Sequence, residues 1–331
     1  MKAYQFNKYH HPAKFQEIVQ PKPQANEVLI KIKAAGLNPV DLKIQAGKMK
    51  ILMHYHLPLT MGNELAGEVM KIGNQVTDFK VGDRVYARPS HAYTGTLTEM
   101  ISLPINQIAH MPADLDYVSA SGIPLTGLTS YQALIELGHV QPGQKVFIQA
   151  GAGGIGTIAI QIAKALGAYV ATTASSANVK LVRELGADQV INYQTDYFAD
   201  VLQNYDLAFD TLGGKYLADS FKILKPGAKL ITINGLPDYK FGRTHGFSLA
   251  KSLLFGLASH KLTRLAKKAD VQYDFLLMHA SGQQLQMLTT MVEQHQLTPI
   301  IDSVYQFEDV AKAYQKLAKG HTKGKLIVKN I

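Results

Sequence analysis

Apolar and polar positions follow one pattern in the first 120 residues of this 331-residue chain and another beyond them. In the first part, the segments 27–38, 64–73 and 80–89 run apolar or alternate with polar residues, and Gly, Pro and Asp interrupt them. Short segments of this kind predict a β-rich domain. Gly82 and Asp83 predict a turn between two of its strands.

From residue 145 onward, short apolar runs alternate with segments of helical spacing. In residues 155–166 the apolar side chains recur as on one face of a helix. The predicted strands are 145–150, 169–173, 189–193, 206–210 and 229–235, and 178–186 is a further predicted helix. Strands that alternate with helices indicate right-handed βαβ units, and therefore an α/β domain with a doubly wound parallel sheet of the Rossmann type.

A glycine-rich loop joins the first of these strands to the first helix, in KVFIQAGAGGIGTIAIQ. Gly151, Gly153 and Gly156 form the pattern G-x-G-x-x-G. The first glycine allows a tight turn, the second lets the backbone approach a pyrophosphate, and the third lets the helix pack closely on the sheet. The helix amides then face the phosphate. The loop predicts a bound dinucleotide, and an adenosylmethionine site on a similar sheet is the main alternative.

The end of the second predicted strand bears on which dinucleotide is bound. NAD-binding sheets carry an Asp or Glu about 20 residues past the loop, which takes the ribose hydroxyls. Ser175 and Ser176 stand there instead, and Lys180 and Arg183 follow on the next helix. No carboxylate would repel a 2′-phosphate, so the sequence favours NADP(H). Alternatively, the two serines only cap the helix.

Composition narrows the class of protein. A chain with 47% hydrophobic residues can form two domains with substantial cores. It contains no cysteine, which excludes disulfides, thiol nucleophiles, Cys-type zinc sites and iron–sulfur clusters. The N-terminal segment lacks the apolar core of a signal peptide, and no apolar run is long enough to span a bilayer. We therefore expect a soluble, cytoplasmic protein.

The net charge of +9 is concentrated in one segment, because seven basic residues and no acidic residue lie between 240 and 269. The rest of the chain is near neutrality, so no specific nucleic-acid partner is expected. The region 249–268 within this segment predicts an amphipathic helix with a leucine-rich face. It could lie peripherally on an anionic membrane. We favour a helix that covers the cofactor domain, or forms a subunit contact, with a solvated basic edge.

Seven segments occur in an order and approximate spacing that resemble the medium-chain dehydrogenase/reductase superfamily. They are GLNPVD (36–41), GNELAGEV (62–69), VGDRVYA (81–87), GTLTEM (95–100), GIPLTGLTSYQAL (122–134), PGQKVFIQAGAGGIG (142–156) and GKLIV (324–328). The chain is similar to the zinc-independent NADPH:quinone oxidoreductase branch, related to zeta-crystallin. This resemblance implies a GroES-like β-rich catalytic domain (1–122 and 274–331), an inserted Rossmann NADP(H)-binding domain (123–273), and a homodimer.

The sequence departs from the zinc-dependent members of that superfamily at the positions of the metal ligands. Asn38 stands where they have a cysteine, Asn63 where they have a histidine, and the third ligand position falls near Gly122. Asparagine and glycine do not ligate catalytic zinc. His54 and His56, two residues apart in a loop, are a weak alternative metal position. We therefore expect no metal.

A missing metal restricts the reaction. Hydride addition to a simple ketone places negative charge on oxygen, which zinc stabilises as a Lewis acid. A quinone or an activated alkene such as an α,β-unsaturated carbonyl delocalises that charge itself. The predicted activity is therefore hydride transfer from NADPH to one of these small molecules. The alternatives are a non-catalytic NADPH-binding protein, crystallin-like or nucleic-acid-binding, or a zinc-dependent alcohol dehydrogenase.

The resemblance also implies which residues serve the reaction and the cofactor. Asn38 and Thr126 are expected near the nicotinamide, and Lys43 is a candidate for stabilising an enolate or delivering a proton. The residues expected to bind the cofactor are Gly151, Gly153, Gly154, Ile155, Gly156, Ser175, Ser176, Tyr193, Leu212, Gly213, Asn234, Gly235 and Lys325. Proton delivery from water is the alternative to Lys43.

Overall fold

The computed structural model describes residues 1–331 and divides them into two compact units. Unit 1 comprises residues 1–128 and 279–331, and unit 2 comprises residues 129–278. The boundaries expected from the sequence lie a few residues before these. No helix has the length and apolar character needed to cross a bilayer.

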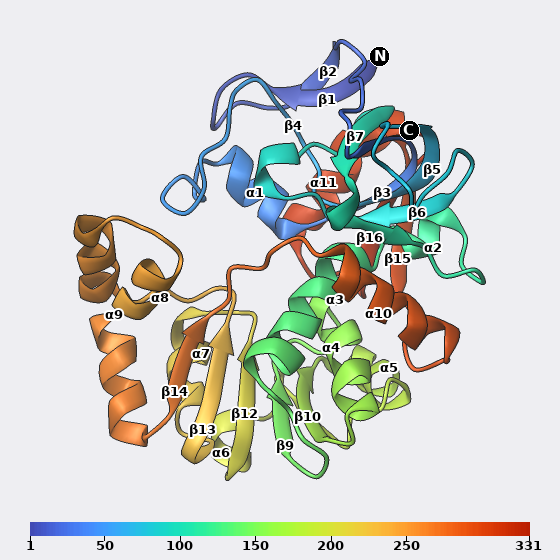
Figure 1. The fold of residues 1–331 in the computed structure, drawn as a ribbon. Helices are drawn as coiled ribbons and strands as arrows, with labels where there is room; N and C mark the ends of the chain where they lie inside the picture. Colours follow the sequence, from blue (N-terminus) through green and yellow to red (C-terminus); the bar gives the residue numbers. More distant parts are fainter. The chain divides into compact units, whose positions relative to one another are not determined.

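Unit 1 is the β-rich part of the chain (Figure 1), as predicted. Its seven-stranded sheet has the order β15-β16-β3-β5-β6-β8, with β7 also paired to β3, and a three-stranded sheet has the order β2-β1-β4. Their bounds are β1 Lys2–Phe6, β2 Lys14–Glu17, β3 Glu27–Leu37, β4 Leu59–Thr60, β5 Leu65–Ile72, β6 Arg84–Ala87, β7 Met100–Pro104, β8 Ile108–His110, β15 Ile301–Gln306 and β16 Lys325–Lys329. The C-terminal strand β16 pairs with β3, so the end of the chain completes this sheet.

Short helices cover unit 1. They are α1 Pro39–Gln45, α2 Tyr117–Ala120, α3 Pro124–Tyr131, α10 Gly282–Glu293 and α11 Val310–Lys319, with the 3-10 turns His91–Tyr93, Ile105–Gln107 and Phe307–Asp309. Helix α3 begins in unit 1 and ends in unit 2. Helix α11 buries Val310, Ala313, Tyr314 and Leu317 in a core shared with β1, β3, β16 and α1. This packing brings Tyr314 to the start of α1.

Unit 2 confirms the predicted Rossmann domain, with a six-stranded parallel sheet in the order β11-β10-β9-β12-β13-β14. The strands are β9 Lys145–Ile148, β10 Tyr169–Ala174, β11 Gln189–Asn192, β12 Tyr205–Asp210, β13 Leu224–Thr232 and β14 Gln272–Phe275. The helices are α4 Gly154–Ala165, α5 Val179–Glu184, α6 Phe198–Val201, α7 Gly214–Ser220, α8 Tyr239–Thr244 and α9 Leu249–Ala269, with a π-helix at Gln132–Leu137 and a 3-10 turn at Ser176–Asn178. The chain reverses its direction of travel across the sheet between β9 and β12, where sheets of this kind bind ligands.

The predicted leucine-rich helix exists as α9, but its first half does not cover the cofactor domain, which was one of the two interpretations that we favoured. Its buried residues are Ser252, Phe255, Ser259 and Ala266, whereas Leu249, Leu253, Leu254 and Leu257 are exposed. Only Leu262 and Leu265 pack against the core of unit 2. The first half of α9 therefore does not cover the sheet with its leucines.

Close packing between α8 and α9 explains this outcome. A Cβ atom on Gly242 of α8 would lie 2.6 Å from the hydroxyl oxygen of Ser252, so the two helices meet through small residues. Beside this contact, the ring of Phe255 packs against the rings of Phe241 and Phe247. These contacts fix which face of α9 is buried and leave the four leucines on the other side.

Candidate active site

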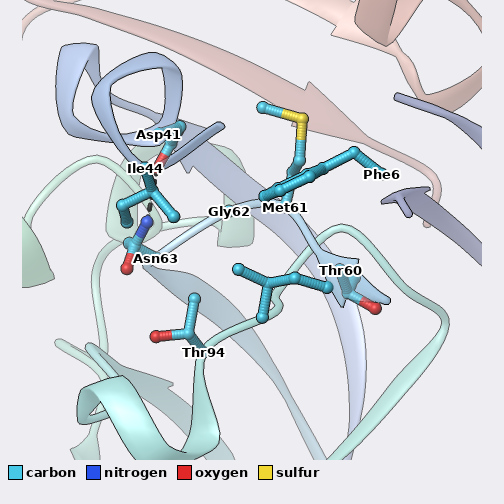
Figure 2. Close-up of a pocket in the computed structure, with 9 residues that line it drawn as sticks. Phe6, Asp41, Ile44, Thr60, Met61, Gly62, Asn63 and Thr94 are labelled. Carbon is cyan, nitrogen blue, oxygen red and sulfur yellow. Dashed lines mark hydrogen bonds between the residues drawn. The ribbon is translucent and has the colours of Figure 1, made fainter. Parts of the chain in front are cut away.

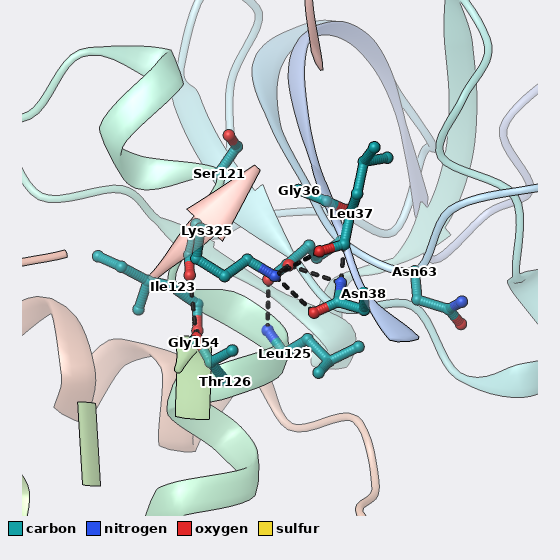
Figure 3. Close-up of polar contacts among 12 residues, drawn as sticks. Gly36, Leu37, Asn38, Asn63, Ser121, Ile123, Leu125, Thr126, Gly154 and Lys325 are labelled. Atoms are coloured by element: carbon teal, nitrogen blue, oxygen red, sulfur yellow. Dashed lines mark hydrogen bonds and ion pairs between the residues drawn. The ribbon is translucent and has the colours of Figure 1, made fainter. Parts of the chain in front are cut away.

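A buried ion pair lies at the centre of unit 1. The Lys325 side chain, from β16, is 4% exposed, and its ammonium lies 2.5 Å from a carboxylate oxygen of Glu64, which is fully buried. The ammonium also donates to the side-chain oxygen of Asn38 and to the Leu37 carbonyl, the latter at 3.0 Å (Figure 3). A lysine has three protons to donate, and here all three have acceptors.

The carboxylate of Glu64 is equally well satisfied. One oxygen accepts from the side-chain amide of Asn38 at 2.8 Å, in addition to Lys325, and the other accepts from the Leu125 amide at 2.7 Å. A Cβ atom on Gly36 would lie 2.3 Å from Glu64 Oε1, so this carboxylate needs a glycine beside it. A buried ion pair persists only when its remaining hydrogen-bonding groups are matched in this way.

A second buried carboxylate, Asp41, stands at the start of α1. It accepts from the Asn38 amide at 2.9 Å, from the side chain of Asn63 at 2.5 Å and from the Tyr314 hydroxyl at 3.0 Å. Burial raises the pKa of Asp41 to about 6, against the lowering effect of these hydrogen bonds, of which the one from Asn63 is the largest. Asp41 therefore holds the backbone of Asn38 and the side chain of Asn63, whereas Glu64 and Lys325 hold the side chain of Asn38.

The positions that ligate zinc in the metal-dependent relatives are thus occupied by a different arrangement. The side chains of Asn38 and Asn63 bind Glu64, Lys325 and Asp41. Gly122 lies against the Lys325 side chain, since a Cβ there would be 3.4 Å from Lys325 Cγ. No group of three or more His, Cys, Asp or Glu side chains is placed to hold a metal ion. Two amides and an ammonium are not zinc ligands, and the adjacent carboxylates of Glu64 and Asp41 are already bound by Lys325 and by these amides.

A small pocket opens beside Asp41 and Asn63 (Figure 2), with an empty volume of about 170 Å³. Its lining is Phe6, Asp41, Ile44, Leu59, Thr60, Met61, Gly62, Asn63 and Thr94. Because that volume includes open solvent, the enclosed part has room for about one water molecule and does not by itself accommodate a substrate.

The other two predicted catalytic residues lie on short helices of unit 1. Lys43 is half-buried on α1, one turn from the N-terminal Asn38, and burial lowers its pKa, with a further lowering by Lys48. Thr126 is 2% exposed near the start of α3, and its hydroxyl donates to the Gly122 carbonyl at 2.9 Å. The structure brings Asn38 and Lys325 into direct contact, and it places Thr126 next to Leu125, which binds Glu64. The catalytic roles of these residues stay predictions.

The sequence analysis did not single out Arg88, Glu64 or Tyr314. Arg88 follows β6 and is 7% exposed, and its Nε makes no hydrogen bond within the protein. Burial lowers the pKa of Arg88, and the neighbouring Tyr55, Glu64 and Asp41 act against that effect. Two of these residues had a signal in the sequence: Arg88 directly follows the apolar run VYA, and Glu64 follows Asn63 in the G-N-E triplet. No local signal marks Tyr314.

The glycine loop in unit 2 has the close approaches that the pattern predicted. A Cβ on Gly156 would lie 2.3 Å from the Ala150 carbonyl oxygen, and one on Gly151 would lie 2.2 Å from the hydroxyl of Thr172 in β10. The positive φ of the turn falls on Ala150, at 52°, and not on a glycine of the motif. Gly151 is therefore needed because a side chain there would clash with β10. Its backbone angles do not require a glycine, which corrects the expectation that Gly151 allows a tight turn.

The same loop leaves room for a pyrophosphate. Gly153 precedes α4 in an extended conformation, and a Cβ there would meet only the Ala150 carbonyl oxygen, at 3.3 Å. The first amides of the 12-residue helix α4 follow directly. These amides and the positive end of the helix dipole fit an anionic group, so Gly153, Gly154, Ile155 and Gly156 could hold a dinucleotide by its phosphates.

The predicted residues for the adenosine end follow β10 and β11. Ser176 is bound by Gln194 and Asn192 through its hydroxyl, at 2.9 Å each. The side chain of Ser175 makes no capping hydrogen bond, although its residue precedes the 3-10 turn. Tyr193 is 52% exposed at the end of β11. The alternative that these serines only cap the helix is therefore not supported at Ser175.

The remaining predicted cofactor residues lie after β12 and β13. The carboxylate of Asp210, at the end of β12, accepts from the amides of Leu212 and Gly213 at 3.2 and 2.9 Å. The side chain of Asn234 donates to the Leu212 carbonyl at 2.8 Å, which ties the two loops together. A Cβ on Gly235 would lie 2.6 Å from the hydroxyl of Tyr273. Asp210 is a further residue that the sequence analysis missed; burial raises its pKa.

Comparisons with known proteins agree with this architecture. The chain matches the family models described as the alcohol dehydrogenase GroES-like domain, over residues 24–113, and the zinc-binding dehydrogenase, over residues 185–328. It is 32% identical to the mitochondrial NAD(P)H oxidoreductase RTN4IP1 of Danio rerio, covering 92% of this chain and 83% of that protein. It is 30% identical to the chloroplast envelope quinone oxidoreductase homolog of Arabidopsis thaliana, covering 99% and 98%.

The chain is also similar to a third relative and to a solved structure over most of its length. The chain is 31% identical to the chloroplastic NADPH-dependent alkenal/one oxidoreductase of Arabidopsis thaliana, covering 94% of this chain and 74% of that protein. The structure of the quinone oxidoreductase from Coxiella burnetii superposes with a TM-score of 0.84 at 29% identity, over 100% of this chain and 99% of that one.

A GroES-like β-rich domain joined to a Rossmann domain, with a phosphate-binding glycine loop, defines the class of two-domain dehydrogenases and reductases. Within that class, this chain belongs to the medium-chain dehydrogenase/reductase superfamily, in its quinone oxidoreductase branch. The resemblance that the sequence motifs indicated is confirmed.

Proposed function

We propose that this protein reduces quinones or α,β-unsaturated carbonyls with NADPH, and that it does so without zinc. The observation that carries the proposal is the buried network at the positions that resemble the zinc-ligand positions of the metal-dependent enzymes, where Asn38 is held between Glu64 and Lys325. The relatives named as quinone and alkenal/one oxidoreductases support the substrate class. NADPH would supply the hydride when bound.

The residues of unit 2 fit a role in binding that cofactor. In this proposal the glycine loop and the first amides of α4 take the pyrophosphate, and Ser175 and Ser176 take the adenosine ribose with its 2′-phosphate. Tyr193 lies by the adenosine, and the tied loops that carry Leu212, Gly213, Asn234 and Gly235 take the nicotinamide half. The absence of a carboxylate beside Ser175 supports NADPH over NADH.

The residues of unit 1 fit a role in stabilising negative charge on the substrate. Asn38 is oriented by Glu64 and Lys325, and its side-chain amide donates to Glu64 at 2.8 Å and to the Gly36 carbonyl at 3.4 Å. In this proposal it releases the longer of these two hydrogen bonds to donate to a substrate oxygen. Lys325 enters the proposal as the residue that positions Asn38, because its three protons already have acceptors. Arg88 offers a buried guanidinium with an unused Nε proton, and such preorganised donors are most effective where water is excluded.

Lys43 fits the role of proton donor. A lysine with a lowered pKa gives up its proton more readily near neutral pH than a solvated one. A quinol or enolate oxygen would be the acceptor of that proton. Thr126, with its hydroxyl held by Gly122, would contact the nicotinamide.

The test is the oxidation of NADPH, followed by absorbance, with a quinone, an enone and a simple ketone offered in parallel to metal-analysed protein. We expect turnover of the quinone or the enone, no turnover of the ketone, and no effect of a chelator. Stoichiometric zinc with chelator-sensitive ketone reduction would refute the proposal. Tight NADPH binding without turnover of any acceptor would favour a non-catalytic binding protein.

The homodimer and the cytoplasmic location expected from the sequence belong to this proposal too. The relatives described above include a mitochondrial and a chloroplastic protein. Light scattering on the purified protein measures the mass, and a monomer at working concentration would remove the dimer from the proposal.

A further inference from the structure

A buried guanidinium in unit 1 has no partner within the protein. Arg88 directly follows β6 and is 7% exposed, and its Nε is shielded from solvent without a hydrogen bond. No hydrogen bond or ion pair of the structure involves its two terminal nitrogens. A guanidinium carries five N–H donors, and it stays charged at neutral pH even where burial lowers its pKa, as it does here. Charged groups are rarely buried without a partner, so a function for this one must be sought.

The nearby carboxylates are occupied by other donors. Leu65 pairs with Ala87 across β5 and β6, so Glu64 and Arg88 are the next residues at the same end of these strands. Both oxygens of Glu64 accept from the donors described above, and so do those of Asp41. The two carboxylates oppose the lowering of the pKa of Arg88, but neither makes an ion pair with it. The protein therefore supplies no acceptor for the N–H groups of Arg88.

A second unpaired polar atom lies close to the same segment. The hydroxyl oxygen of Thr96 is buried and has no hydrogen-bond partner. It lies against Gly62, since a Cβ there would be 2.4 Å from this oxygen, and the Thr96 amide donates to the Gly62 carbonyl at 3.3 Å. Only two other buried side-chain polar atoms lack a partner, and both belong to unit 2. The unpaired polar groups of unit 1 are thus gathered around residues 62–64, which include Asn63 and Glu64.

The number and charge of its donors indicate which chemical group Arg88 would bind. A single carbonyl oxygen accepts two hydrogen bonds at most and brings no charge. A carboxylate has two oxygens that match the planar fork of a guanidinium, and it supplies the missing negative charge. A phosphate of the cofactor has the same chemistry, but the glycine loop and the first amides of α4 already fit those phosphates. A carboxylate on the acceptor is therefore the best match.

We propose that Arg88 binds a carboxylate of the acceptor, so that this protein prefers α,β-unsaturated carbonyls that carry such a group. The inference rests on the proposed function, in which Asn38 donates to the carbonyl oxygen of the same substrate. Asn38 and Arg88 both adjoin Glu64, one through a hydrogen bond of 2.8 Å and the other through the pairing of β5 with β6. The reaction leaves the carboxylate unchanged. Arg88 holds one end of the acceptor, and it is a specificity-determining residue.

The experiment compares two acceptors that differ in charge, 4-oxo-2-pentenoate and its methyl ester, with the oxidation of NADPH followed by absorbance. The ratio of their two kcat/KM values removes any effect that changes both reactions equally. Arg88→Met should lower kcat/KM for the acid by about a hundredfold and for the ester by less than about threefold. Arg88→Lys retains the charge but not the planar fork, and it should lower kcat/KM for the acid by about tenfold.

A stability measurement separates binding from a structural role. Because Arg88 has no partner, Arg88→Met removes an uncompensated buried charge, and the urea midpoint of unit 1 should stay the same or rise. The matched control is Arg84→Met at the start of β6, where the guanidinium is exposed and donates to the carbonyls of Ala113 and Leu115. This control should keep the wild-type ratio of acid to ester. A lower midpoint of Arg88→Met with an unchanged ratio would assign Arg88 to the fold and overturn the inference.

Other outcomes identify a different role for Arg88. Equal losses of kcat/KM for acid and ester would make it a donor to the carbonyl oxygen, and a wild type that reduces the ester but not the acid would have no carboxylate site. NADPH affinity, measured by calorimetry, should be the same in the wild type and in Arg88→Met. A loss of affinity as large as the loss of kcat/KM would assign Arg88 to a phosphate of the cofactor. Each of these results would overturn the inference.

Failure of the proposed function is recognised separately. A wild type that reduces no quinone and no enone would refute that function, and the site is then tested by calorimetry with the saturated analogue 4-oxopentanoate. Binding by the wild type that is lost in Arg88→Met would support the carboxylate site. No binding, or equal binding by both proteins, would reject it.

Discussion

Removal of the buried ammonium of Lys325 tests whether the network around Asn38 is held together as the structure indicates. Methionine at this position keeps much of the aliphatic volume but supplies no proton. It leaves the Glu64 carboxylate, which is fully buried, without its counter-charge, and it leaves the Leu37 carbonyl and the Asn38 side-chain oxygen without this donor. An uncompensated buried charge costs about 3–5 kcal/mol, so Lys325→Met should lose about that much unfolding free energy.

The second substitution separates the charge from the lost packing. Glu64→Gln in the Lys325→Met background removes the buried charge. Because the glutamine NH2 group cannot accept, it leaves one of the two remaining donors to Glu64 without a partner, at about 1–3 kcal/mol. The double variant should therefore be more stable than Lys325→Met alone. A matched control is Lys180→Met, because Lys180 pairs with Glu184 on the surface, with side-chain exposures of 88 and 61%. Its effect should stay within about 1 kcal/mol.

Urea unfolding followed by circular dichroism measures these differences, since the chain has no tryptophan to report by fluorescence. Because the chain has two units, the transition of unit 1 must be resolved from that of unit 2 before a free energy is assigned. The reasoning is refuted if Lys325→Met costs no more than Lys180→Met, or if Glu64→Gln destabilises the Lys325→Met variant further.

Three further predictions concern Asp41, the glycine loop and Lys43. Asp41 has a pKa of about 6 in the folded protein and 3.8 as its ordinary value, so its stabilising contribution is complete below pH 3.8 and is lost as the pH rises through about 6. In urea titrations, the stability of the wild type relative to Asp41→Asn should therefore fall by roughly 3 kcal/mol over that pH range. A stability difference that does not change with pH would contradict the raised pKa. Gly156→Ala should weaken NADPH binding by at least about tenfold in calorimetry, because its Cβ would lie 2.3 Å from the Ala150 carbonyl oxygen. Gly153→Ala should weaken binding much less, because its Cβ would lie 3.3 Å from the same oxygen. Equal losses of affinity would contradict this steric explanation. Lys43→Met should lower kcat by about a hundredfold and remove the fall in activity at high pH. Lys43→Arg should move that fall to a higher pH. An unchanged pH profile would assign proton delivery to water.

The sequence predicted the Rossmann unit well because its signals are local. Residues 155–166 show helical spacing and stand directly after a loop of three spaced glycines, so a helix start and a phosphate site follow from neighbouring residues. The reason for a glycine at position 151 could not be predicted from the local sequence. The closeness of Gly151 to Thr172 is a contact between strands, and no local pattern distinguishes it from a turn that needs a positive φ.

The network in unit 1 depends instead on residues far apart in the chain. Lys325 and Glu64 are 261 positions apart and meet because β16 pairs with β3, while β3 pairs with β5 just beyond Glu64. The motif GKLIV indicated that Lys325 was important but not which residue it would contact. Similarly, the spacing of leucines in α9 predicted the helix but not its buried face, since that face is set by Gly242 and Phe241 of the preceding helix.

The two asparagines show how one change of residue type affects the whole site. In zinc-dependent relatives the same positions supply ligands to a cation, whereas here Asn38 and Asn63 each lie beside a buried carboxylate, Glu64 and Asp41. The counter-charge of Glu64 comes from Lys325, whereas Asp41, without an ammonium at hydrogen-bonding distance, has its pKa raised to about 6 by burial. A fixed ammonium balances Glu64, but with all its protons engaged it cannot bind a substrate oxygen as a Lewis acid does. Lys325 therefore does not replace a Lewis acid, and acceptors that delocalise charge themselves, such as quinones and enones, fit the proposed function.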